Sequence, residues 1–217
     1  MRRRNTPRTT ITLVLVVAAM SSAITSATAG AALPEFLPGK AESTFTGKTG
    51  PSTLAFVNKG TFECPGGKNE GMLLSATEAV LTIDFEKCKA AGVSFESLGD
   101  KEGVVLIHGD MTLCYINKAK REVATVIHPT PIHLAILGKA IEVIGWTIGQ
   151  IDPINRKERL FTLTFEESSV GVQKLKKCET RTEETLLATE NGVAFEKASL
   201  VMQDEIDFSG IEQEVMA

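Results

Sequence analysis

The sequence predicts an all-β fold: a single-domain antiparallel β-sandwich or β-barrel of about ten short strands, with little helix. Two observations lead to this class. Short segments rich in β-branched and aromatic residues alternate apolar and polar positions, and turn residues separate them. The chain after residue 29 shows no convincing long helical period, no internal repeat and no low-complexity linker.

Residues 1–29 have the composition of a secretory signal peptide. Four arginines form a basic start, Ile11 to Ala23 is apolar, and Ala27-Thr28-Ala29 fits the signal peptidase site. The apolar run is too short to cross ~30 Å of hydrocarbon as a helix. We therefore expect a secreted or envelope protein without an integral membrane segment after signal removal.

The mature chain is predicted to be acidic. Removal of the signal leaves 188 residues with 19 basic and 27 acidic side chains, a net charge of −8. Such a chain is long enough for a sound core. Its charge makes it a poor candidate for binding nucleic acid or an anionic membrane surface. The partner stays unknown, with a cell-envelope component as one candidate.

Four cysteines lie in the mature chain, at positions 64, 88, 114 and 178. An even number in an exported protein favours disulfides over metal binding or catalysis. Three connectivities are open. We favour Cys64–Cys88, because the segment between them can fold back as a hairpin. Cys114–Cys178 then follows by elimination, although Cys114 lies mid-strand and would also suit a buried thiol.

The clearest structural unit runs from Gly103 to His128 and is predicted to be a β-hairpin. Its first arm contains Val104 to Ile107 and Met111 to Ile116, and its second contains Val123 to Ile127. Asn117 to Lys120 supply the polar turn.

Before this hairpin, residues 30–42 contain two prolines and are predicted to be an extended lead-in to a domain at 43–217. Residues 89–102 are predicted to be loop, and Asn58-Lys59-Gly60 to be a hairpin turn. The expected strands are Ser43–Thr46, Ser52–Val57, Thr61–Cys64 and Ala79–Phe85.

After the hairpin, residues 133–144 fit either a helix or a strand. Gly138 and Gly145 disfavour a helix, so we predict a strand from Ala140 to Ile148. Residues 152–155 and 190–192 are expected turns. The remaining expected strands are Leu160–Phe165, Val170–Lys176, Glu184–Thr189, Ala194–Met202 and Glu205–Phe208.

Several stretches resemble a group of secreted actinobacterial proteins. In chain order they are Leu33-Pro34-Glu35-Phe36, Phe45-Thr46-Gly47-Lys48, Cys64 and Cys88, Tyr115-Ile116-Asn117-Lys118-Ala119, and Ile148-Gly149-Gln150-Ile151-Asp152-Pro153-Ile154-Asn155. That group occurs as many paralogues per genome without an assigned function, so the resemblance implies export and no catalytic residue. Two departures, Cys114 and the apolar stretch 132–146, leave the second disulfide open.

Motifs for catalysis are weak. The chain has no Gly-x-Ser-x-Gly and no Gly-x-Gly-x-x-Gly, and Gly47-Lys48-Thr49 lacks the first glycine of a phosphate loop. The acid pairs Asp84 and Glu86, and Glu166 and Glu167, alternate or adjoin on predicted strand exteriors, where acids are normally solvated. We predict no catalytic residue and no cofactor.

The three histidines form the one polar group that we considered for metal binding. His108 and His128 end the two arms of the predicted hairpin, and Asp110 and His133 are near in sequence. Zinc requires three or four ligands at about 2 Å. We favour three unrelated histidines over a site.

Three functional hypotheses follow from the sequence. The first is an exported non-catalytic β-domain that acts through its surface. The second is a metal-binding protein or hydrolase that uses the histidines. The third is a carrier for a small ligand with an apolar interior, and the apolar stretch 132–146 is its support.

Overall fold

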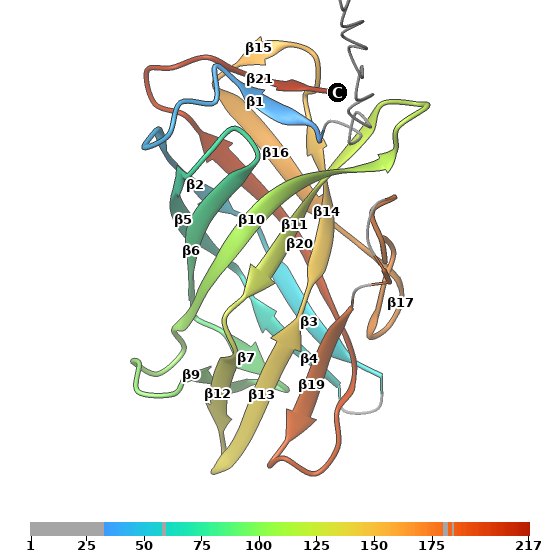
Figure 1. Ribbon diagram of the computed structural model, residues 1–217. Coiled ribbons are helices and arrows are strands. Elements are labelled where there is room, and N and C mark those ends of the chain that lie inside the picture. Colours follow the sequence, from blue (N-terminus) through green and yellow to red (C-terminus); the bar gives the residue numbers. More distant parts are fainter. Residues whose placement is uncertain (1–32, 58–59, 180–181, 184) are drawn as a thin grey trace, which may run out of the picture. The chain divides into compact units, whose positions relative to one another are not determined.

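The structure is a computed structural model that describes residues 33–57, 60–179, 182–183 and 185–217 (Figure 1). The predicted signal peptide, and Asn58 and Lys59 of the predicted turn, lie outside the described residues. The described residues form strands and connecting turns, which confirms the all-β class. Leu33–Ala217 make one compact unit.

Eight antiparallel strands close into a barrel, because β20 pairs with both β2 and β16. The order around the barrel is β16, β14, β11, β10, β6, β5, β2 and β20. Their bounds are Leu160–Phe165, Thr147–Asp152, Glu122–Pro129, Val105–Asn117, Glu78–Glu86, Gly66–Leu73, Thr44–Thr49 and Glu196–Asp207. The predicted central hairpin is confirmed as β10 and β11, with Met111 opposite Ile127.

A second sheet is formed by strands that pair with the first half of the long strand β20. Here β20 pairs with β19 on one side and β3 on the other. One arm continues through β13 and β12 to β9, and the other through β4 and β7 to β8. Their bounds are β3 Ser52–Phe56, β4 Gly60–Cys64, β7 Lys89–Ala90, β8 Val93–Ser94, β9 Glu96–Ser97, β12 Ile132–Ile136, β13 Lys139–Gly145 and β19 Leu186–Glu190.

Two small sheets complete the fold. β21 (Gln213–Met216) pairs with β1 (Glu35–Leu37) and β15 (Lys157–Glu158), at the end of the barrel opposite to β12 and β13 (Figure 1). Phe36 of β1 packs at 5.5 Å between ring centroids on Phe208. β17 (Glu167–Ser169) and β18 (Val172–Gln173) form a separate hairpin.

The core follows from alternation along each strand. In β6 the side chains of Ala79, Leu81, Ile83 and Phe85 are all buried, as their apolar-polar pattern predicts. In the second sheet the rings of Phe56 and Phe62 lie 4.9 Å apart, and those of Phe62 and Phe95 5.0 Å apart. The interiors of the barrel and of the second sheet share one contiguous hydrophobic cluster.

Both disulfides favoured by the sequence are present, Cys64–Cys88 and Cys114–Cys178. The second joins β10 to the segment that follows β18. Cys178 packs there with Val126 and Ile148 on the outer face of the barrel, in a small apolar cluster separate from the core. Paired cysteines indicate an oxidising compartment.

Several predicted boundaries were wrong. The lead-in contains a strand, β1, because β21 pairs with it. Residues 89–102 contain the short strands β7, β8 and β9 rather than loop alone. The expected strand Ala140–Ile148 is two strands in different sheets, divided at Trp146, and Val170–Lys176 holds only the short β18. The helical alternative for residues 133–144 is also wrong, since β12 and β13 form a hairpin there.

Candidate functional site

A hollow with a mainly apolar wall opens at the end of the second sheet. It is a cavity of about 420 Å³, which we call the mouth cavity. Its walls come from the ends of β3, β4, β12, β13 and β19 and from the β7–β8 turn. Its volume lies in the range of small-molecule sites, roughly 300–1,000 Å³.

The wall of the mouth cavity is mainly apolar. Its hydrophobic lining residues include Phe56, Phe62, Val93, Ile136, Ile141 and Ala188. Phe62 and Ile141 alternate along their strands with more exposed residues, so the pleat directs their side chains inward. Such a wall favours an apolar ligand, because burial removes apolar surface from water.

A smaller cavity of about 50 Å³ lies further inside and is lined by Ile83, Ile107, Val143 and Met202. Phe62 lines both cavities. Phe62 is therefore a shared wall residue of the two cavities.

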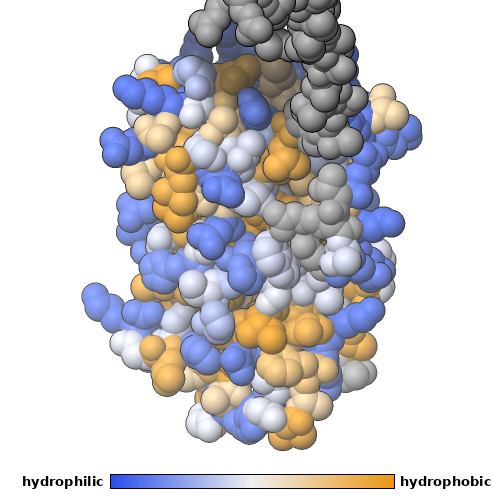
Figure 2. All heavy atoms as spheres, in the orientation of Figure 1, coloured by the Kyte–Doolittle hydropathy of each residue, from blue (hydrophilic) through white to orange (hydrophobic). Residues whose placement is uncertain are grey.

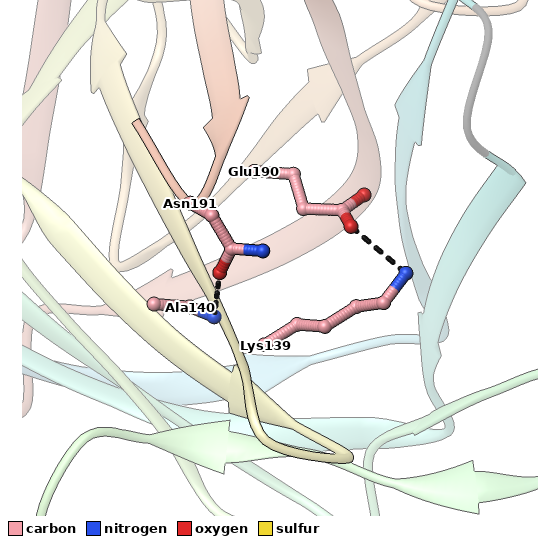
Figure 3. Close-up of polar contacts among 4 residues, drawn as sticks. All are labelled: Lys139, Ala140, Glu190 and Asn191. Carbon is pink, nitrogen blue, oxygen red and sulfur yellow. Dashed lines mark hydrogen bonds and ion pairs between the residues drawn. The ribbon is translucent and has the colours of Figure 1, made fainter. Parts of the chain in front are cut away.

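Polar groups at the entrance tie two hairpins together (Figure 3). Lys139 of β13 makes an ion pair of 2.8 Å with Glu190 of β19. The Ala140 backbone N–H donates to Asn191 Oδ1 at 3.0 Å, and the Asn191 N–H donates to the Ala140 carbonyl at 2.7 Å. Lys139 and Glu190 both line the mouth cavity, and so does Glu196.

A second polar group lies inside the barrel and was not found from the sequence. Asp204 is fully buried, and its Oδ1 accepts hydrogen bonds from Thr49 Oγ1 at 2.5 Å and Asn69 Nδ2 at 2.6 Å. Its Oδ2 has no hydrogen-bond partner. Burial raises the pKa of Asp204 to about 6, although both hydrogen bonds act to lower it. These three residues line neither of the two cavities above.

The histidines do not gather. His108 lies on β10 with its Nδ1 2.9 Å from Thr82 Oγ1, and with Asp110 it lines an open outer groove of about 500 Å³. His128 is opposite Asp110 in the register but stacks on Trp146 at 4.1 Å between ring centroids. His133 lies on β12 in the second sheet, opposite Glu142. Within the described ranges, no three His, Cys, Asp or Glu residues are placed to hold a metal ion.

The other residues considered for chemistry lie on strands or make local contacts. Gly47-Lys48-Thr49 belongs to β2, so it is not a phosphate loop. Glu166 pairs with Lys174 at 2.6 Å, and Glu167 accepts a hydrogen bond from Ser199 at 2.7 Å. Asp84 lies 3.2 Å from Lys68. No helix in the described part of the chain is long and apolar enough to span a bilayer.

One sequence feature indicated the mouth cavity. The apolar stretch 132–146 contributes β12 and β13, which form one wall. Another wall comes from β4 and the β7–β8 turn. The sequence predicted β4 and its hairpin with β3, but it predicted residues 89–102 as loop, so the pairing of β4 with β7 was missed. No protein family, curated protein or solved structure that was compared with the chain matches it.

Proposed function

We propose that the mature chain is an exported, non-catalytic carrier that holds a small apolar ligand in the mouth cavity. The observation that carries this proposal is the cavity of about 420 Å³ with a mainly apolar wall at an open sheet end. It favours the third of the sequence-based hypotheses. The surface-acting hypothesis stays a prediction, and the dispersed histidines give the metal-binding hypothesis no support.

The composition of the wall supports a carrier rather than an enzyme. The charged lining side chains are Lys139, Glu190 and Glu196, and Lys139 and Glu190 are paired with each other. Most of the other lining side chains are aromatic or aliphatic, such as Phe62 and Ile141, and Thr61 and Thr189 add two hydroxyl groups. General acid–base or nucleophilic chemistry needs polar groups that converge on a reacting atom. The wall supplies apolar contact instead.

A probe titration tests the proposal. The uncharged dye N-phenyl-1-naphthylamine is expected to bind the mature chain saturably and to gain fluorescence on leaving water. Replacing Ile136 by Trp places a large ring in the cavity and should weaken dye binding by about tenfold or more, since it fills the space that the ligand needs.

The matched control for this variant is Ala135→Trp. Ala135 is the neighbouring residue on β12 and does not line the cavity. Dye binding should be unchanged in this control. If Ile136→Trp does not fold, Val93→Trp serves the same purpose, because Val93 also lines the cavity. Absence of saturable binding to the native chain, or equal binding by all folded variants, would refute the proposed carrier function.

A further inference from the structure

Three exposed apolar side chains flank the entrance of the mouth cavity. Leu137 is 77% exposed in the β12–β13 turn, and Val193 and Phe195 are 82% and 48% exposed in the β19–β20 turn. We call these three residues the rim. Both turns lie at the same end of the molecule (Figure 1). Figure 2 shows apolar side chains at this lower end of the view.

The rim is held as a unit. Strands β13 and β19 are neighbours, with Ile141 opposite Glu190. The two hydrogen bonds between Asn191 and Ala140, and the Lys139–Glu190 ion pair, join the two turns directly behind the rim (Figure 3). The apolar tips are therefore presented together rather than on independent loops.

Leu137 conflicts with the local requirements of its turn. Leu137 and Gly138 are the two central residues between the paired Ile136 and Lys139, with φ of 48° and 75°. Two positive φ values define the hairpin turn that Asn-Gly forms best. A bulky leucine in the left-handed region is unfavourable, and at 77% exposure it gains little from packing within the chain. Such a conflict between residue and turn is expected at functional positions.

We propose that the rim inserts into the surface of a lipid bilayer, so that the mouth cavity opens onto the lipid from which its ligand is drawn. This inference rests on the proposed carrier function. An apolar ligand is scarce in water and concentrated in lipid, so a carrier benefits from an entrance that contacts the lipid phase. Leu137 lines that entrance and belongs to the rim.

The charges at this end indicate which lipid surface fits. Exposed Lys139 and Lys197 each follow an apolar tip by two residues, and lysines beside inserted apolar side chains suit the headgroup layer of a bilayer. Glu190 is paired with Lys139 and balances this charge. The mature chain carries −8 in total, so an anionic bilayer would repel it. A zwitterionic lipid surface therefore suits the rim.

Vesicle flotation tests the inference with the full mature chain. The native chain should float with phosphatidylcholine vesicles and should not require phosphatidylglycerol. Leu137→Asn should reduce the bound fraction severalfold, and Val193→Ser combined with Phe195→Ser by about tenfold or more, because each removes apolar surface from the interface. Leu137→Asn supplies the residue that the turn prefers, so its thermal stability should equal or exceed that of the native chain.

Controls separate this inference from the carrier function. Leu98→Asn removes an equally exposed leucine, 75% accessible, that does not line the cavity, and should float like the native chain. Val193 and Phe195 do not line the cavity either, so their double variant should still bind N-phenyl-1-naphthylamine in solution.

Three outcomes would overturn the inference while leaving dye binding intact. The first is no flotation of the native chain, and the second is flotation that the rim variants do not change or that only anionic vesicles support. The third is a native dimer that Leu137→Asn converts to a monomer without any vesicle binding, which would make a second copy the partner of the rim. Loss of dye binding with retained flotation would instead overturn the carrier function alone.

Discussion

At the scale of single residues, the burial of the Asp204 carboxyl group has a clear cost in folding free energy. It faces the barrel interior, where water cannot solvate its charge, and one carboxylate oxygen has no hydrogen-bond partner. The hydroxyl of Thr49 and the amide of Asn69 offset this cost only in part. Burial therefore favours the protonated form, and the pKa of Asp204 rises to about 6.

This shift predicts a pH dependence of stability. In the window between 3.8 and about 6, the folded chain holds a proton on Asp204 that the unfolded chain has released. The free energy of unfolding should therefore fall as pH rises from 4 to 7, by about 2 kcal/mol for this group. Asp204→Asn mimics the protonated carboxyl and should remove that fall. Urea unfolding of both proteins at pH 4 and pH 7 measures the difference.

If the native chain and Asp204→Asn lose the same stability between the two pH values, the raised pKa of Asp204 is refuted. Thr46→Ala is a suitable control, since Thr46 lies on the same strand β2 but is exposed. Its pH dependence should match that of the native chain.

At the scale of elements, sequence patterns predicted the strands that bury one face and missed those that do not. β6 and β16 alternate apolar and polar residues, and their predicted bounds agree closely with the structure. β5 has the sequence Gly-Gly-Lys-Asn-Glu-Gly-Met-Leu and shows no such pattern. It is a strand because β2 and β6 pair with it on both sides. Its glycines are required by packing: a Cβ on Gly71 would lie 2.2 Å from the ring of Phe45.

The candidate site was less predictable than the fold, for a related reason. The mouth cavity needs β12 and β13 to face β3, β4 and the β7–β8 turn across the second sheet. Those contacts depend on pairings between distant segments, such as β20 with β3. The apolar stretch 132–146 indicated an apolar interior, but neither the pairing of β4 with β7 nor the cavity follows from local pattern.

The role of β16 in the barrel gives a stability prediction. Leu163 and Phe165 face the core and are fully buried. Leu163→Ala or Phe165→Ala should lower the free energy of unfolding by about 2–5 kcal/mol, through lost burial and the cavity left behind. Chemical denaturation measures the loss. The intervening Thr164 is half-buried and faces outward, so Thr164→Ala should cost much less. Losses below about 1 kcal/mol at both core positions would place β16 outside the cooperative core.

At the scale of the whole molecule, one long strand connects a closed barrel to an open sheet. The second half of β20 closes the barrel through β16, and its first half carries the second sheet. The barrel interior is packed with side chains such as Phe161 and Leu163, and Phe36 packs into its far end. The mouth cavity and the exposed rim lie at the opposite end of the molecule, in the second sheet. The fold thus separates a packed structural half from a half suited to binding.

The central claim is that an apolar ligand binds in the mouth cavity, and a methyl-resolved NMR titration with N-phenyl-1-naphthylamine tests it most directly. The account predicts saturable shifts at Ile136, Ile141 and Ala188, which line the cavity. Methyl groups on the outer face of the barrel, such as those of Thr82 and Thr130 beside His108, should not shift. Shifts confined to that outer groove, or no saturable shift at any methyl group, would contradict it.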